Sequence, residues 1–496
     1  MPNSIWDRLR DVANTVREEW PSVTDADTLL QTSMTTAIEM AATRYAVDAG
    51  AQWSPGQPLK LLLTGYSGTR NTGADVRVEE MIRQFRHLCG DDHLELGVTT
   101  IDPKETRNYF RTVRQLHIPK IFPKFLYDHI HDYHGVITCE GSMFKSKFAN
   151  ALSTMMAGSL GLALAENRLA IGYGGEAGSM DDNLRNFVAK HCRHAYIIAR
   201  NEASQDILAD LNIRTDAGTD TAWTFEPAPD SVGQELLRNA GWDGKKPILA
   251  ICPINPFWWP VKADIGRAIS HRFTGAHSEA HYDSVYFHHS GPDVDEAQDR
   301  YLSAIAEAVD RFNEETDTFT ILVGMEMLDR KAATALNRKL GERCALFISD
   351  EHDMYEMISV LYQCSLVVSS RYHALVTSMP GGVPSIGITM DERIRNLMND
   401  RDHPELALEV DDPDLAANLF DRLQRVHKNA DYYAEGISRC VIKNLERMGR
   451  MGQLFVDHVR ETHPEFPFDV HLGSHGDPWE HLPPLPPHLQ RMLAKP

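Results

Sequence analysis

Short apolar segments, each followed by a stretch long enough for a helix, recur along most of this 496-residue chain. The clearest strand-like segments span 59–64, 94–101, 135–138, 169–175, 195–199, 248–252, 319–323, 344–348, 365–368 and 384–388. Strands that alternate with helices in this way form mostly parallel sheets with helices on both faces. The chain is too long for one ordinary core, so the pattern predicts two doubly wound, Rossmann-like α/β halves that face one cleft.

Breaker residues near 226–246 separate the two halves. We expect a helical N-terminal extension over 1–57, a first Rossmann-like domain over 58–230 and a second over 245–410. Residues 411–496 then hold helices that pack back on the first domain, followed by a tail rich in Pro and His.

Overall charge and cysteine placement exclude several classes of function. The formal net charge is −20 with no long basic run, which argues against nucleic acid and a bare anionic membrane as partners. Seven cysteines stand singly without a CxxC pair, so we expect neither structural zinc nor a disulfide framework. The first twenty residues are charged and lack the apolar core of a secretion signal, which favours a cytoplasmic protein.

The strand at 365–368 runs into a turn that carries Arg371, Tyr372 and His373. A guanidinium binds phosphate or carboxylate through paired hydrogen bonds, and an imidazole can move a proton near neutral pH. This pair suits chemistry on a small phosphorylated acid. The alternative is a strand-end salt bridge beside a helix-capping histidine.

The glycine-rich turn 65–73 follows the first strand and precedes a helix. Its backbone N–H groups could face an anion, or it could be a tight turn with no ligand. Asn71 is a candidate for orienting a sugar hydroxyl, and Asp75 is either a base or a carboxylate that stabilises the helix dipole. Glu140 follows a buried strand and could take a proton from an attacking hydroxyl. Arg200 is either a cation for the ligand or a helix-start salt bridge.

Several of these pieces, in this order, resemble the polysaccharide pyruvyl transferases, whose two-lobed fold is like that of GT-B glycosyltransferases. The matching elements are the first glycine turn, Cys139-Glu140-Gly141-Ser142, the segment 199–204 with Asp220-Thr221-Ala222, Arg371-Tyr372-His373, Gly382-Val383-Pro384 and Asp391-Glu392-Arg393-Ile394. The resemblance implies an enzyme that moves an enolpyruvyl unit from phosphoenolpyruvate onto a sugar as a cyclic ketal. It also implies that Arg371 and His373 hold the donor, with further cations from Arg200 and Arg393. The remaining expected substrate contacts are Tyr372, Gly68, Gly73, Gly141 and Ser142.

The chemistry of that reaction suits the residues at hand. Phosphoenolpyruvate carries about three negative charges, which several arginines in a shielded cleft can bind. Transfer needs a proton at the methylene carbon of the donor, and His373 is the best candidate acid. Glu140 and Asp75 are the candidate bases. We expect no metal and no organic cofactor.

An extra segment over 257–295 follows the first strand of the second half. His277 and His281 have the i, i+4 spacing of a metal-binding pair, but we favour a polar loop over the acceptor. The acceptor could be a free, nucleotide-linked or lipid-linked sugar, and both a peripheral membrane contact through that acceptor and a homo-oligomer stay open. The competing functions are a GT-B glycosyltransferase that uses a nucleotide-sugar and a non-catalytic saccharide-binding relative.

Overall fold

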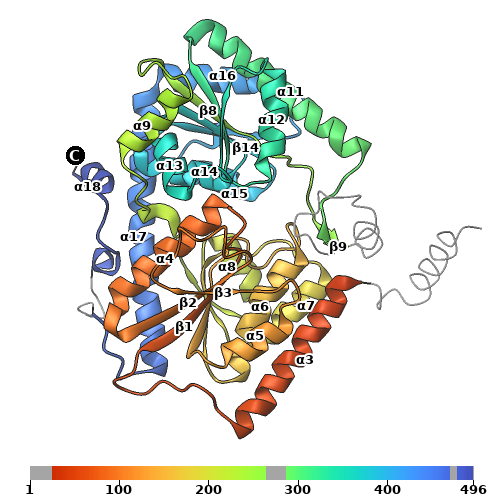
Figure 1. Ribbon diagram of the computed structural model, residues 1–496, viewed down its shortest axis with the longest axis vertical. Helices are drawn as coiled ribbons and strands as arrows, with labels where there is room; N and C mark the ends of the chain where they lie inside the picture. Colours follow the sequence, from red (N-terminus) through yellow and green to blue (C-terminus); the bar gives the residue numbers. More distant parts are fainter. Residues whose placement is uncertain (1–24, 264–285, 470–476, 495–496) are drawn as a thin grey trace, which may run out of the picture.

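The computed structural model describes residues 25–263, 286–469 and 477–494. They form two lobes stacked along the long axis of the molecule, with a parallel sheet in each (Figure 1). This confirms the predicted α/β class with two sheets.

The first lobe contains a seven-stranded parallel sheet in the order β3-β2-β1-β4-β5-β6-β7. Its strands are β1 (Leu59–Thr64), β2 (Leu94–Thr100), β3 (Arg114–His117), β4 (Gly135–Thr138), β5 (Leu169–Gly175), β6 (Tyr196–Ala199) and β7 (Arg214–Ala217). The accompanying helices are α4 (Thr72–Cys89), α5 (Pro123–Ile130), α6 (Asn150–Ala165), α7 (Asp182–His191) and α8 (Glu202–Ala209). The central strands are buried along their whole length, which is why they read as continuous apolar runs.

The second lobe contains a six-stranded parallel sheet in the order β12-β11-β8-β13-β14-β15. Its strands are β8 (Ile248–Cys252), β11 (Phe319–Gly324), β12 (Ala345–Ile348), β13 (Leu366–Ser369), β14 (Ser385–Thr389) and β15 (Ala407–Glu409). Its helices are α11 (Pro292–Thr316), α12 (Asp329–Lys339), α13 (Met354–Tyr362), α14 (Tyr372–Ser378), α15 (Glu392–Asp400) and α16 (Leu415–Lys428). Helix α9 (Asp230–Asn239), which follows the first lobe in sequence, packs against α13.

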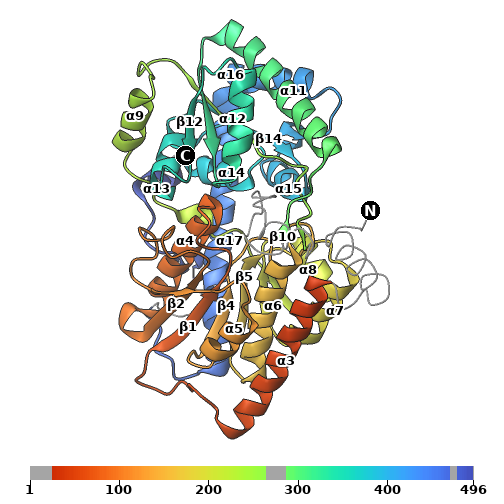
Figure 2. The same ribbon diagram turned by 45° about the vertical axis from the view of Figure 1, so that its right-hand side comes forward.

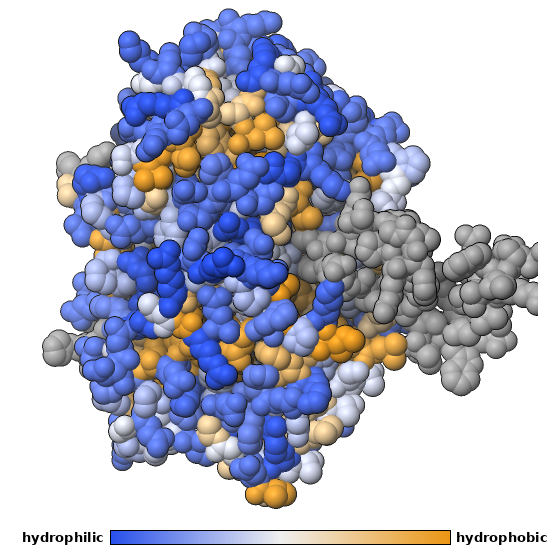
Figure 3. Space-filling model, viewed as in Figure 1, coloured by the Kyte–Doolittle hydropathy of each residue, from blue (hydrophilic) through white to orange (hydrophobic). Residues whose placement is uncertain are grey.

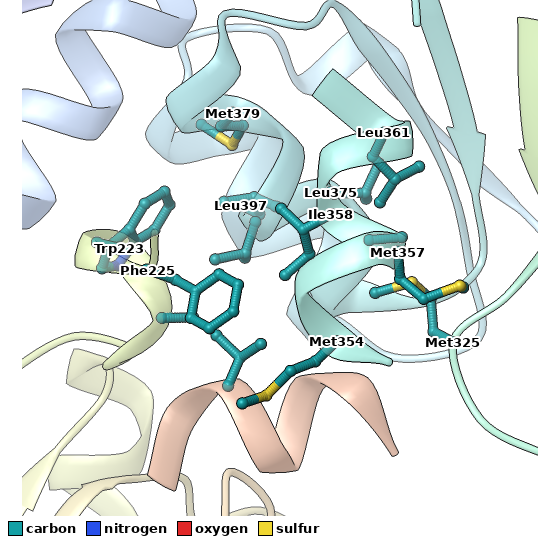
Figure 4. Packing of buried hydrophobic residues seen from close by; sticks show 14 of the residues in the cluster. Trp223, Phe225, Met325, Met354, Met357, Ile358, Leu361, Leu375, Met379 and Leu397 are labelled. Carbon is teal, nitrogen blue, oxygen red and sulfur yellow. The ribbon is translucent and has the colours of Figure 1, made fainter. Parts of the chain in front are cut away.

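Two features hold the lobes together. The 33-residue helix α17 (Ala430–Thr462) leaves the second lobe and packs against α4, β5 and β7 of the first (Figure 1). Trp223 and Phe225, which follow β7, belong to one apolar cluster with Met354 and Leu397 of the second lobe (Figure 4). The chain then ends in a 3-10 turn (Pro478–His481) beside α17 and in α18 (Pro487–Leu493).

Additional segments cover the side of the first lobe. Helix α3 (Ala26–Val47) runs along α5 and α6 (Figure 2). A short antiparallel pair, β9 (Lys262–Ala263) and β10 (Tyr286–Phe287), extends from the second lobe, and Val261 packs with Ala149 of the first. Among the described residues, no helix is both long and apolar enough to cross a lipid bilayer.

Candidate active site

The turn between β13 and α14 sends its two charged side chains to different partners. The strand ends at Ser369 and the helix begins at Tyr372, so Arg371 occupies the N-cap position. The Ser369 hydroxyl accepts a hydrogen bond from the Arg371 backbone N–H at 2.9 Å, which fixes the turn. From this turn His373 reaches the first lobe, whereas Arg371 stays with carboxylates of the second lobe.

Asp220 lies at the centre of a buried cluster of two arginines and one histidine. Its Oδ2 is 3.3 Å from Arg77 Nε, 3.1 Å from Arg200 Nη1 and 3.3 Å from His373 Nε2. The side chains of Asp220 and Arg77 are fully buried. Although burial alone would raise the pKa of Asp220, Arg77, His373 and Arg200 hold it well below the usual range. Asp220 is therefore a fixed negative charge that positions two arginines and one histidine, which come from both lobes.

His373 is held in one orientation by this carboxylate. Because Asp220 is ionised, the nitrogen facing it, Nε2, must carry a proton, which leaves Nδ1 as the site that gains or loses one. Burial lowers the pKa of His373; Asp220 opposes the shift, and Arg77 and Arg200 add to it. Burial thus favours the neutral imidazole when no anionic ligand is bound.

The first lobe makes room for this ring at Gly73, in the first turn of α4. A Cβ at Gly73 would lie 2.2 Å from His373 Nδ1, closer than any real contact. Glycine is required here because the helix backbone touches the imidazole of the other lobe. The predicted residues Gly73 and His373 are therefore brought together.

Arg371 is bound by two buried carboxylates of the second lobe. Its Nε and Nη2 donate to Asp329, at 2.9 and 2.5 Å for the shortest contacts, and Nη2 also lies 2.8 Å from Glu326 Oε2. Glu326 in turn accepts hydrogen bonds from Tyr66 at 3.2 Å and Asn71 at 3.3 Å across the cleft. Burial raises the pKa of Asp329 to about 6, against the opposing effect of Arg371. Arg371 was expected to bind the donor, but two carboxylates already hold its guanidinium. Its side chain is nevertheless 17% exposed.

A small pocket with a cavity volume of about 30 Å³ opens beside the Asp220 cluster. It is lined by both lobes and by α17, through Arg200, Asn201, Thr219, Trp223, Tyr372, Arg393, Asn396, Leu397, Asp400 and Asn444. Two predicted cations, Arg200 and Arg393, therefore share one cavity with Tyr372.

Those two cations differ in how firmly they are held. Arg200 pairs with Glu176 and Asp220, and its guanidinium lies 4.8 Å from the ring centre of Tyr372. Arg393 pairs with Asp391, two residues earlier on its own turn, at 2.8 Å. Arg393 therefore has a local ion-pair partner, whereas the ion-pair partners of Arg200 come from other parts of the chain.

The two candidate bases lie in different surroundings. Asp75 is fully buried, and among the described residues the Gly68 backbone N–H lies near its carboxylate without forming a hydrogen bond of good geometry. Burial raises its pKa well above the ordinary value; the Gly68 amide and Arg70 oppose this, and Glu140 and Glu326 add to it. Glu140 is only partly buried and accepts a hydrogen bond from the Gly141 backbone N–H at 2.8 Å. Glu140 is the more accessible carboxylate.

The remaining predicted residues shape the backbone around these groups. Gly68 has φ +91°, and a Cβ there would lie 2.7 Å from the backbone nitrogen of Asp102. Gly141 leaves space for Arg200 and Arg77, whose guanidinium nitrogens would lie 3.1 and 3.2 Å from a Cβ at this position. Ser142 is buried next to it. These glycines allow close packing of the turn and of the arginines.

Sequence reasoning gave no role to several charged residues of the cleft, namely Arg77, Lys145, Glu176, Asp220, Glu326 and Asp329. In the sequence, Asp220 is only part of a motif, and Arg77 resembles any helix arginine, although the structure buries it completely. Lys145 is buried and bridges the lobes, at 3.1 Å from Glu176 and 2.5 Å from Glu392. No local spacing marked these residues, because their partners come from distant parts of the chain.

The described residues contain no group of three or more His, Cys, Asp or Glu side chains that could hold a metal ion. The candidate pair His277 and His281 lies outside the described residues.

Residues 95–392 match the sequence model of the polysaccharide pyruvyl transferases. The chain belongs to this family. The match covers more than half of the chain and includes Glu140, Arg200, Asp220, Arg371 and His373.

Solved structures share the two-lobed fold at low sequence identity. A provisionally assigned UDP-N-acetylglucosamine 2-epimerase from Listeria monocytogenes aligns with a TM-score of 0.51 and 12% identity over 82% of this chain and 97% of that chain. The UDP-GlcNAc 2-epimerase of Neisseria meningitidis aligns at 0.49 and 10% identity, over 81% and 100% of the two chains. A glycosyltransferase from Streptomyces sp. SF2575 aligns at 0.38 and 9%, over 78% and 95%. The Listeria likeness shows a shared fold and confirms the predicted GT-B-like arrangement.

Proposed function

We propose that the chain transfers the enolpyruvyl unit of phosphoenolpyruvate to a saccharide-containing acceptor and closes it into a ketal. The observation that supports this most directly is that His373 of one lobe is held by Asp220 of the other, and that Arg200, which shares Asp220, lines the neighbouring interlobe pocket. Such an arrangement joins a proton donor to an anion-binding site at the place where two substrates would meet.

The donor's charges fit the pocket lined by Arg200 and Arg393. Phosphate and carboxylate groups bind guanidinium groups through charge-assisted hydrogen bonds, each worth about 1.5–3 kcal/mol. Asn201 and Asn396 of the same lining can add amide hydrogen bonds. Arg371 then acts as a positioning residue, because it orders Glu326 and through it Tyr66 and Asn71 of the first lobe.

His373 supplies the proton that starts the transfer. An anion bound beside Arg200 offsets one of the cations that lower the pKa of His373, so Nδ1 takes up a proton when the donor binds, and the lobes must part at Gly73 for the donor to reach this nitrogen. That proton moves to the methylene carbon of the donor and leaves an oxocarbenium-like centre at the adjacent carbon. One acceptor hydroxyl attacks this centre, and a second hydroxyl replaces the phosphate, which leaves with the remaining proton.

Removal of the proton from the attacking hydroxyl is assigned to Glu140. It lies at the carboxyl end of β4 and is partly exposed, whereas Asp75 is sealed from solvent. No step of this scheme requires a metal or an organic cofactor. The acceptor is a sugar that is free, nucleotide-linked or lipid-linked.

The test is phosphate release from phosphoenolpyruvate in the presence of a panel of saccharide acceptors. His373→Gln should lower the rate by about 10²–10⁴-fold, the contribution of a general acid, while the donor still raises the melting temperature. His427→Gln, at an exposed position on α16, is the matched control and should leave the rate unchanged.

Two results would contradict the proposal. One is an unchanged rate in His373→Gln. The other is a melting temperature that responds to nucleoside diphosphates and not to phosphoenolpyruvate, which would favour a nucleotide-sugar glycosyltransferase.

A further inference from the structure

We propose that one edge of the first lobe is a docking surface for a membrane that contains anionic phospholipid. The surface, here called the edge patch, comprises Lys104, Arg107, Arg111, Arg114 and Ile121. It does not depend on the identity of the donor.

The edge patch differs in charge from the rest of the protein. Residues 101–124 contain six Lys and Arg against two Asp and Glu, a net charge of +4 in a chain whose net charge is −20. In Figure 3, strongly hydrophilic residues alternate with hydrophobic ones over the middle of the first lobe. The overall charge therefore does not describe this edge.

Backbone and side-chain contacts hold the segment together as one face. The side-chain amide of Gln115, on the edge strand β3, donates to the carbonyl groups of Thr106 and Tyr109 at 3.3 and 2.8 Å. Ile118 donates its backbone N–H to Thr100 at 2.9 Å, which places the loop after β3 beside the end of β2. The cations of 104–114 and the loop with Ile121 thus lie along the same sheet edge.

The four cations are available to a partner. Lys104, Arg107, Arg111 and Arg114 are exposed, and none forms an ion pair with another residue in the described part of the chain. The acidic neighbour Glu105 is paired with Arg70 at 3.4 Å. Four unpaired cations on one edge attract a polyanionic surface.

Protection of an edge strand against aggregation explains only part of the edge patch. A charged residue on the strand itself, such as Arg114, serves that purpose. The three loop cations lie outside the strand. Ile121 is 80% exposed, and an exposed apolar side chain would favour aggregation rather than prevent it. An apolar side chain between Lys120 and Lys124 instead fits insertion at a lipid headgroup boundary, where lysines stay at the surface. This feature favours a membrane over a soluble polyanion.

The net charge of −20 does not prevent this edge from binding an anionic membrane, because electrostatic attraction acts over short distances in salt. At physiological salt, charges more than about 8 Å away are largely screened, so acidic groups elsewhere on the protein contribute little at this edge. The edge patch also adjoins the cleft, because Tyr109 of the same loop accepts a hydrogen bond from the backbone N–H of Met354 in the second lobe at 2.9 Å. Docking would therefore bring the cleft mouth close to a lipid-linked acceptor.

The experiment measures co-sedimentation of the full chain with phosphatidylcholine vesicles, with and without added phosphatidylglycerol. We expect binding only to the anionic vesicles, and expect it to weaken as salt is raised. Each surface cation contributes about fivefold to such binding, so Arg107→Gln, Arg111→Gln and Arg114→Gln together should lower the partition coefficient by roughly 100-fold. Ile121→Ser should lower it by a smaller factor.

The control removes three exposed cations from the other lobe and α17, by Lys428→Gln, Arg439→Gln and Arg450→Gln. This variant should bind vesicles as the unaltered chain does, and melting temperatures check that both variants fold. Three outcomes would overturn the proposal: no binding to anionic vesicles, equal loss in both variants, or binding only to a soluble acidic polysaccharide. The assay uses neither phosphoenolpyruvate nor an acceptor, so it is independent of the proposed reaction.

Discussion

Two charged clusters in the same cleft have opposite compositions, although they start from residues two positions apart. Around Asp220, two guanidinium groups and one imidazole surround one carboxylate. Around Arg371, two buried carboxylates surround one guanidinium. Arg200 of the Asp220 cluster is shared with Glu176 and still lines the pocket, so it can meet an anion, whereas Arg371 is enclosed by carboxylates. A short motif can therefore divide its work between substrate chemistry and the alignment of two lobes.

The largest effect should follow from breaking the Asp220 cluster. Asp220→Asn leaves the fully buried Arg77 without its counter-ion, which should lower the free energy of unfolding by about 3–5 kcal/mol. Urea denaturation measures this loss. Asp350→Asn, which breaks an exposed pair with Arg330, is the control and should cost at most about 1 kcal/mol. Equal losses in both variants would show that the cluster is not the buried anchor described here.

A pair of arginine variants separates the two clusters directly. Arg393→Gln should raise the KM for phosphoenolpyruvate about 10- to 100-fold with a smaller loss of stability, because Asp391 keeps the nearby Lys145 and the hydrogen bond from the backbone N–H of residue 393. Arg371→Gln should instead lower stability by about 2–4 kcal/mol, because Asp329 and Glu326 are then buried together without a cation. Denaturation and donor-dependent kinetics are measured for both variants. The reverse pattern would return Arg371 to the direct donor contact that the family resemblance implies.

A change at Gly73 tests the contact between the lobes without altering any charge. The added methyl group of Gly73→Ala must displace His373, so we expect a cost of about 1–3 kcal/mol and a reduced kcat. Gly56→Ala, where a Cβ meets nothing within 4 Å but φ is +86°, should cost some stability and leave kcat unchanged. An unaltered kcat in Gly73→Ala would mean that the imidazole position is not critical.

The smallest effect concerns pH. Burial lowers the pKa of Lys145 to about 8, with Arg393 adding to the shift and Glu392 opposing it. Above that pH the ammonium group loses its proton, and donor affinity should fall by about two- to fivefold. Lys145→Gln should lack this alkaline dependence. Between about 8 and the ordinary lysine value of about 10.4 the unfolded chain binds more protons, so the stability of the unaltered chain should rise with pH relative to the variant.

Much of the architecture was predictable from local sequence. Buried parallel strands must be apolar on both faces, so β1, β5, β8 and β11 stand out as apolar runs between helices. The residues at strand ends could likewise be named as candidates, because the carboxyl ends of parallel strands carry binding groups. The local sequence does not show whether each candidate contacts a substrate or a neighbouring side chain.

The sequence by itself determined the two-sheet α/β class, the family and the position of Arg371 and His373 on one turn. The tertiary structure decided which carboxylate each of them meets, because Asp220, Asp329 and Glu326 come from separate loops brought together only when both sheets close the cleft. It also decided that Arg77 is buried and that Lys145 joins the lobes. Electrostatic effects depend on distances of a few ångströms between groups remote in sequence, and those distances exist only in the folded chain.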